Sequence, residues 1–290
     1  SKFCEKSWNS GWSFNFIKRK MIVGIDFGIT NTDIAISDNS NSKFFSIPSK
    51  KINNDFLLEI FDFIQLNIDE VEKIAVTGGK SSNLNNSFKN IPIVKVNEVN
   101  AIGYGAIELY GINNKPFVAI SSGTGTACIY HADKKFNHLG GISIGGGTLQ
   151  GLSNYIISTN KPSQIEKLAS SGKRESLDLL IGEAVNEIGS LYPEITASNF
   201  VKGKITKKHS SEDIAASLSN MIGEVIGTIS YLNAMICGLD EVYFLGRTSL
   251  NKTIKDGIED RLKLANVKGN FADNREYGNV LGVLKFIKEN

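Results

Sequence analysis

The chain has 290 residues, of which 41% are hydrophobic and 21% charged, and its formal net charge is +2. This length is enough to bury one large core or two medium cores in adjacent lobes. Charges of both signs are mixed along the sequence and no apolar run approaches the ~20 residues that span a bilayer, so neither a nucleic-acid nor a membrane partner is indicated. A globular protein that acts on small molecules is favoured.

The first twenty residues and the cysteines bear on processing and location. Residues 1–20 lack the uninterrupted apolar segment of a secretory signal, and we interpret them as an extension before a natural start at Met21. Cys4, Cys128 and Cys237 are far apart and form no C-x-x-C pair for zinc or an iron–sulfur cluster. They indicate reduced thiols and therefore a cytoplasmic protein.

The first half of the chain after Met21 alternates strand and helix patterns. Short runs rich in Ile, Val and Phe that turn at Gly, Asn and Ser are typical of strands. Apolar residues spaced three and four apart predict helices. In chain order these patterns predict antiparallel strands over 22–26, 33–37 and 43–47, a helix over 56–68, a strand over 73–76 that ends in Thr-Gly-Gly-Lys, a strand over 93–95 and a helix over 98–110.

The second half repeats the strand meander and then becomes mostly helical. It predicts strands over 117–121, 127–131 and 136–139, a long helix over 213–238 with a wide apolar stripe, a buried strand over 241–246, and helices over 250–264 and 277–287. A meander that occurs twice implies two related lobes, over 21–113 and 114–290. Each lobe would have a mixed sheet and flanking helices, with a nucleotide cleft between them.

Two glycine- and threonine-rich stretches interrupt strand-like runs, with a lone glutamate, Glu98, between them. They read GIDFGITNTDIAI over 24–36 and SSGTGTACIY over 121–130. Such turns bring backbone N–H groups up to an anion, and two facing turns would clamp a phosphate chain. A third stretch, LGGISIGGGTLQGL over 139–152, has too little bulk for a core strand and would let a purine or sugar approach the main chain.

These motifs, together with the Glu98 helix and the IGEVIG sequence of the long helix, resemble in order and spacing the type II pantothenate kinases. That family belongs to the acetate and sugar kinase, heat-shock protein and actin superfamily, and the resemblance runs from Met21 to the C-terminus. It implies an α/β, two-lobed actin-like ATPase (ribonuclease H-like) fold with duplicated mixed sheets. It also implies a kinase that uses ATP and Mg²⁺ to phosphorylate the primary hydroxyl of pantothenate or a close relative, the first step of coenzyme A biosynthesis.

The resemblance assigns the nucleotide side of the site. Asp26 would face the magnesium ion, although a turn-capping carboxylate is the alternative. A lysine of the family is replaced by Asp33, so phosphate charge must be met by backbone N–H groups and magnesium, or by a base such as Lys80 or Arg247. A surface arginine without a role in binding is an equal alternative for Arg247. The implied ATP-binding residues are Asp26, Gly28, Ile29, Thr30, Asn31, Thr32, Asp33, Thr124, Gly146, Gly147, Thr148, Leu149, Gln150, Gly246 and Arg247.

Glu98 aligns with the general base of the family, which takes the proton of the acceptor hydroxyl as its oxygen attacks the terminal phosphorus. The alternative is a first-turn glutamate that only complements the helix dipole. The implied acceptor-side residues are Glu98, Gly123, Thr124, Thr126, Ala127 and His138.

The acceptor side departs from the family pattern at two positions. His138 stands where family members have an arginine that grips the pantothenate carboxylate, and Ala127 replaces a serine that helps to bind the same ligand. Histidine is partly neutral near its ordinary pKa of ~6.5 and lacks the bidentate fork that suits a carboxylate. We therefore expect an altered acceptor, such as pantetheine. A strand-end histidine bonded to the backbone is the alternative for His138.

The resemblance also implies a homodimer that pairs through the helix over 213–238, although the same stripe would suit a core helix. Two other functions remain open. An ATPase that activates a radical dehydratase shares the fold but needs cysteines around an iron–sulfur cluster, and Cys128 and Cys237 lie in unsuitable contexts. A catalytically idle member would bind nucleotide or acyl-CoA as a sensor or scaffold.

Overall fold

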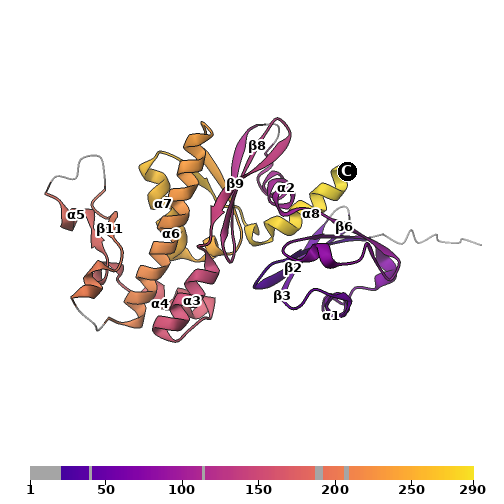
Figure 1. The fold of residues 1–290 in the computed structure, drawn as a ribbon, viewed down its shortest axis with the longest axis horizontal. Helices are drawn as coiled ribbons and strands as arrows, with labels where there is room; N and C mark the ends of the chain where they lie inside the picture. Colours follow the sequence, from indigo (N-terminus) through magenta and orange to yellow (C-terminus); the bar gives the residue numbers. More distant parts are fainter. Residues whose placement is uncertain (1–20, 39–40, 113–114, 187–191, 206–208) are drawn as a thin grey trace, which may run out of the picture.

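The computed structural model describes residues 21–38, 41–112, 115–186, 192–205 and 209–290. The chain forms two mixed β-sheets with helices packed on them, and the C-terminal helix returns to the side of the first sheet (Figure 1). The predicted extension over 1–20 lies outside the described residues. Among the described helices, none is both long and apolar enough to cross a membrane.

The first sheet has the strand order β3-β2-β1-β4-β6-β5. The predicted meander is confirmed, because β1, β2 and β3 are antiparallel neighbours, whereas β4 and β6 run parallel to β1. Its strands are β1 (Met21–Phe27), β2 (Asn31–Ser37), β3 (Ser42–Pro48), β4 (Val71–Thr77), β5 (Ser87–Phe88) and β6 (Ile91–Lys95).

One face of this sheet is covered by α1 (Asn54–Ile64), which packs Phe56, Leu57 and Ile60 into the core. Asn53 caps the helix by accepting a hydrogen bond from the Phe56 N–H at 2.9 Å. The helix ends four residues before the predicted residue 68, because Gln65 adopts the left-handed conformation that terminates it.

The opposite face of the first sheet is covered by α8 (Gly278–Glu289), which crosses α2 (Glu98–Tyr110). Small residues allow these helices to approach. A Cβ added at Gly24 of β1 would lie 3.1 Å from Leu284 of α8, and one added at Gly282 would overlap the carbonyl oxygen of Ala101. The last helix of the chain is therefore packed on the first sheet rather than on the second.

The second sheet has the strand order β13-β12-β7-β8-β9 and repeats the antiparallel meander in β7, β8 and β9. The glycine-rich stretch from residue 139 begins in β9, at the edge of this sheet, and continues into α3 (Gly146–Ile157), which agrees with its lack of bulk. The strands are β7 (Phe117–Ser122), β8 (Thr126–Ala132), β9 (Lys135–Ile142), β12 (Glu241–Leu245) and β13 (Lys268–Asn270).

The long helix α6 (Ser211–Ile236) packs on α7 (Lys252–Leu264) and on the second sheet, where Val118, Ile120 and Phe244 share one core with it. The lobe boundary near residue 113 stays a prediction, since residues 113–114 are outside the described ranges. The other elements are α4 (Pro162–Ser171), β10 (Leu179–Leu180), α5 (Ile181–Ala184), β11 (Thr196–Ser198) and 3₁₀ turns at Ile68–Glu70, Ser81–Asn83, Arg174–Ser176, Val201–Lys204, Thr248–Leu250 and Arg275–Tyr277.

Candidate functional site

Three polar side chains lie in a row where β2, β1 and β4 meet at one end of the first sheet. Asp26 of β1 is opposite Asp33 in the antiparallel register with β2, and it is beside Thr77 in the parallel register with β4. Thr77 is fully buried, and its hydroxyl has no hydrogen-bond partner among the described residues. The row is therefore polar and incompletely satisfied within the protein.

The Asp26 carboxylate lies in surroundings that oppose its negative charge. Burial, followed by the negative charge of Asp33, raises its pKa to about 7, although the Asn279 side chain donates a hydrogen bond to Oδ2 at 3.1 Å. Gly78 covers the other oxygen, since its φ is +86° and an added Cβ would lie 2.7 Å from Oδ1. A carboxylate in this position would be stabilised by a bound cation.

Glu98 is the first residue of α2, as predicted, and lies close enough to Asp26 for its charge to contribute to the raised Asp26 pKa. The helix is capped by Asn97, whose side chain accepts from the Asn100 N–H at 2.8 Å. The Glu98 side chain is exposed and forms no hydrogen bond or ion pair with another described residue. Its carboxylate is therefore free to accept a proton from a ligand.

The first glycine turn meets the second. Thr30 in the exposed tip of the first turn places its Oγ1 3.0 Å from Oγ1 of Thr124 in the second turn. Ile29 beside it is 82% exposed, whereas Gly28 has no room for a side chain, because a Cβ would lie 2.5 Å from the Asn31 carbonyl oxygen. Two turns that are 94 residues apart in sequence thus face each other, as the sequence predicted.

The first turn is held in place by the hydroxyl groups of Thr32 and Ser49. Thr32 is fully buried with its Oγ1 3.0 Å from the hydroxyl of Ser49, and the Ser49 hydroxyl donates to the Gly28 carbonyl at 2.6 Å. The Thr32 side chain therefore holds the turn, while Asn31 is half-buried at the start of β2.

The second turn is joined to the N-terminus of α3. Gly146 donates its N–H to the Gly123 carbonyl at 2.8 Å, and Gly147 donates to the Thr124 carbonyl at 3.1 Å. The hydroxyl hydrogens of two predicted ligand residues are already engaged, since Thr126 donates to the Ile144 carbonyl and Thr148 to the Ser143 carbonyl. Leu149 is buried in the core, and Gln150 is half-buried on α3.

The turn after β12, the third turn, is joined to the second turn. Gly246 has a φ of +91°, and a Cβ there would lie 2.6 Å from the Ser122 carbonyl carbon. The Thr248 hydroxyl donates to the Gly123 carbonyl at 2.7 Å and accepts from the Gly146 N–H at 3.2 Å. This turn therefore shares its hydrogen bonds with the second turn and with the start of α3.

Arg247 crosses from the third turn to the first sheet. Its Nη2 forms an ion pair with Asp33 and donates to the Ser46 hydroxyl at 2.9 Å. Arg247 therefore contacts Asp33, a residue of the predicted site, and its role in ATP binding stays a prediction. Burial raises the pKa of the Asp33 carboxyl, while the Arg247 charge acts in the opposite direction. Lys80, the other candidate base, is exposed on the loop after β4.

The two acceptor-side departures lie on neighbouring strands of the second sheet. Ala127 of β8 is paired with Gly141 of β9, and a bulge at Leu139 separates this pair from the pair of His138 with Ile129. The His138 side chain is exposed and makes no hydrogen bond with a described residue. The expected alternative of a histidine bonded to the backbone is therefore not observed.

The donor groups at the end of the first sheet fit a magnesium ion bound together with a polyphosphate. Among the described residues, no three His, Cys, Asp or Glu side chains are grouped so that they alone could hold a metal. Mg²⁺ is commonly held by one or two carboxylates together with phosphate oxygens and water. Asp26 offers such a carboxylate, and the unpartnered Thr77 hydroxyl beside it offers a partner for a metal-bound water.

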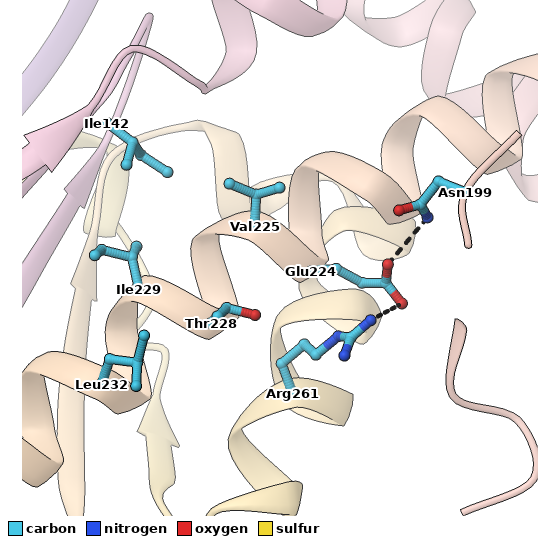
Figure 2. Close-up of a pocket in the computed structure, with 8 residues that line it drawn as sticks. All are labelled: Ile142, Asn199, Glu224, Val225, Thr228, Ile229, Leu232 and Arg261. Carbon is cyan, nitrogen blue, oxygen red and sulfur yellow. Dashed lines mark hydrogen bonds and ion pairs between the residues drawn. The ribbon is translucent and has the colours of Figure 1, made fainter. Parts of the chain in front are cut away.

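A separate hollow of about 380 Å³ lies along α6 (Figure 2). At one end Glu224 pairs with Arg261 at 3.0 Å and accepts a hydrogen bond from Asn199 at 3.0 Å, and apolar side chains together with Thr228 form the rest of the wall. None of the predicted ATP-binding or acceptor residues lines this hollow. Its lining is Ile142, Asn199, Glu224, Val225, Thr228, Ile229, Leu232 and Arg261.

Sequence reasoning missed several residues that complete the site. Asn279 and Thr248 contact site residues from the second half of the chain, and Ser46 and Ser49 do so from the first half. Asn279 stands near the start of a predicted helix, but its contact with Asp26 spans 253 residues of sequence and has no local signal. Thr77 ends a predicted strand next to a Gly-Gly pair, a signal that could have placed it at the site.

Comparison with known protein families and sequences gives a consistent result. Residues 110–255 match the model of the Fumble family. A type II pantothenate kinase of Bacillus anthracis is 32% identical to this chain over 237 residues, which cover 79% of this chain and 83% of the relative.

Comparison with solved structures confirms the two-lobed actin-like ATPase fold with two mixed sheets. An activator of the 2-hydroxyisocaproyl-CoA dehydratase from Clostridium difficile, solved with bound ADPNP, has a TM-score of 0.63 and 15% identity over 92% of this chain and 93% of that chain. A ROK family glucokinase from Streptomyces griseus, solved with glucose and AMPPNP, has a TM-score of 0.57 and 12% identity over 93% of this chain and 100% of that chain.

Proposed function

This chain belongs to the Fumble family of type II pantothenate kinases, and we propose from this premise that it is an ATP- and Mg²⁺-dependent kinase for a primary hydroxyl of pantothenate or a close relative. The observation that carries the proposal is the meeting of the two glycine turns at Thr30 and Thr124, next to Asp26 and Glu98. Such turns can bind a polyphosphate through their N–H groups, and solved proteins with this fold bind ATP analogues.

In the proposed reaction the acceptor oxygen attacks the terminal phosphorus of ATP, the bond from that phosphorus to the bridging oxygen breaks, and ADP leaves. The Glu98 carboxylate takes the proton of the acceptor hydroxyl. The turn N–H groups hold the phosphates in line, which supplies much of the rate enhancement in phosphoryl transfer. Asp26 would hold Mg²⁺, and the ion supplies neutralisation of phosphate charge.

The residues on the acceptor side favour a substrate whose binding depends less on carboxylate recognition than that of pantothenate. Ala127 supplies no hydroxyl, and the exposed His138 offers one ring hydrogen-bond donor when neutral instead of a guanidinium fork. A neutral relative such as pantetheine suits these groups better.

The exposed face of α6 supports pairing of two copies of this chain. Val225, Leu232, Met235 and Ile236 are 38%, 42%, 59% and 80% exposed, and they include two residues that line the hollow in Figure 2. Apolar side chains on one helix face are typical of a two-fold interface. We therefore include a homodimer that pairs through α6 in the proposal. The proposal also keeps the predicted cytoplasmic location and the predicted lobes over 21–113 and 114–290. The helix α8 belongs to the second of these segments but packs on the first sheet.

Glu98→Gln tests the proposal. The variant should bind AMPPNP like the wild type and lose most of its turnover, because an amide cannot take the proton. Glu108→Gln is the matched control, since Glu108 lies on the same helix but contacts Lys285, at 3.3 Å. Turnover is measured by mass spectrometry over a panel that includes pantothenate and pantetheine. Wild-type turnover in the Glu98→Gln variant would refute the base assignment, and a wild-type chain that binds AMPPNP but phosphorylates no acceptor would be a scaffold.

A further inference from the structure

Arg247 brings positive charge to a group of carboxylates at the end of the first sheet. Asp26 and Asp33 are paired in register, and Glu98 is near enough to Asp26 to repel its charge. The Lys95 ammonium, on β6 two strands away from β1, donates to the carbonyls of Ser82 and Leu84. In the described ranges, Arg247 is the basic residue that forms an ion pair with one of these three carboxylates.

The guanidinium of Arg247 uses only part of its binding capacity. Nη2 contacts Asp33 and Ser46, while Nη1 and Nε make no hydrogen bond with a described residue. One face of the group lies 5.3 Å from the centre of the Tyr277 ring, which in turn stacks on Phe44 at 4.8 Å. The side chain is 32% exposed. It is therefore held in place with hydrogen-bond donors left for an anion.

The residues on either side of Arg247 are held by Arg275, which precedes α8, and by the second turn. Gly246 donates its N–H to the Arg275 carbonyl at 2.8 Å, and the neighbouring Thr248 hydroxyl bridges Gly123 and Gly146. A polyphosphate bound between the first and second turns would thus lie next to the main chain of Arg247.

From this geometry we infer that Arg247 is the side-chain cation that binds the polyphosphate of ATP, and that Asp33 is its positioning residue. Asp33 is 8% exposed, so a phosphate that drew Arg247 away would leave an unpaired buried carboxylate, which is costly. The ion pair therefore stays intact when the anion arrives, and the free Nη1 and Nε donors meet it. The inference rests on the proposed function only in taking the anion to be the phosphates of ATP.

The test is a cycle of variants titrated calorimetrically with AMPPNP and, by displacement, with adenosine, in the absence of any acceptor. Arg247→Gln should weaken AMPPNP binding about 10- to 100-fold, the loss of a charged hydrogen bond, and leave adenosine binding within about twofold. Asp33→Asn should weaken AMPPNP binding by less, about 3- to 10-fold. Because Asp33 acts through Arg247, the double variant should bind AMPPNP no more weakly than Arg247→Gln alone.

The double variant also guards against misfolding, since it removes both members of the buried pair, and Lys252→Gln controls for loss of one exposed charge at a residue that is 77% exposed. AMPPNP affinity within twofold of wild type in Arg247→Gln would overturn the inference, as would an equal loss of adenosine binding. Tighter AMPPNP binding in Asp33→Asn would show that Asp33 competes with phosphate instead of positioning the arginine. A chain that binds AMPPNP but has no kinase activity would overturn the proposed function and leave this result intact.

Discussion

Asp26→Asn should stabilise the protein at alkaline pH while it abolishes phosphoryl transfer. The Asp26 carboxyl is surrounded by Gly78, Asn279 and the negative charges of Asp33 and Glu98, and burial raises its pKa from 3.8 to about 7. Asparagine keeps an oxygen that accepts the Asn279 hydrogen bond and carries no charge. The substitution therefore removes an electrostatic cost and, with it, the carboxylate proposed to hold Mg²⁺.

The sign and size of the effect follow from proton binding. Because the folded pKa lies above the unfolded one, the native state binds more protons between pH ~4 and ~7, and the stability that Asp26 contributes falls as pH rises through this window. A pKa of Asp26 raised from 3.8 to about 7 corresponds to at most ~4 kcal/mol of stability. Asp26 is only partly buried, so solvent and small rearrangements reduce the expected effect to about 1–3 kcal/mol.

Urea unfolding at several values between pH 5 and pH 8.5 measures this effect. The free energy of unfolding of the wild type should fall relative to that of Asp26→Asn by about 1–2 kcal/mol across the range. Asp256→Asn is the control, because Asp256 lies on α7 in an exposed pair with Lys252. Parallel pH profiles for wild type and Asp26→Asn would refute the reasoning, as would full kinase activity of the variant.

Two further predictions concern helix packing and the acceptor. Gly282→Ala should lower the free energy of unfolding by about 3 kcal/mol, because the new Cβ would overlap the Ala101 carbonyl and lie 2.7 Å from the Gly105 nitrogen where α8 crosses α2. The control Gly151→Ala, on α3 with open space around it, should instead raise the free energy of unfolding by up to ~1 kcal/mol. Equal effects of the two substitutions in urea unfolding would contradict the packing argument. His138→Arg should lower the KM for pantothenate at least several-fold through carboxylate binding, whereas a low-micromolar KM in the wild type would refute the altered-acceptor idea.

The sequence predicted both strand meanders and the long helices closely. Alternating apolar residues and Gly, Asn and Ser turns are local signals, and the predicted strands 33–37 and 117–121 lie within β2 and β7, each within two residues of their ends. The short elements between residues 172 and 210 were not predicted. There β10 and β11 have only two and three residues, too few to show a period.

The meeting of the two glycine turns was also predictable, because each interrupts the same meander at the same place. Side-chain direction within the turns was not. The sequence treats Thr30, Thr32, Thr126 and Thr148 alike, yet only Thr30 projects its hydroxyl towards the other turn. The other three hydroxyls contact neighbouring groups of their own lobe, which depends on backbone geometry that residue identity does not specify.

The predicted helix at the C-terminus contributes Asn279 to the candidate site because of where it packs, between the two sheets' polar ends. The Ser121 hydroxyl, on β7 of the second sheet, lies 3.4 Å from Oδ1 of Asn279, and the amide nitrogen of the same side chain donates to Asp26 of the first sheet. Because one planar amide joins both contacts, a displacement of the second sheet that shifts Ser121 would also change the hydrogen bond to Asp26. The carboxylate proposed to hold Mg²⁺ is thereby coupled to the position of the opposite lobe.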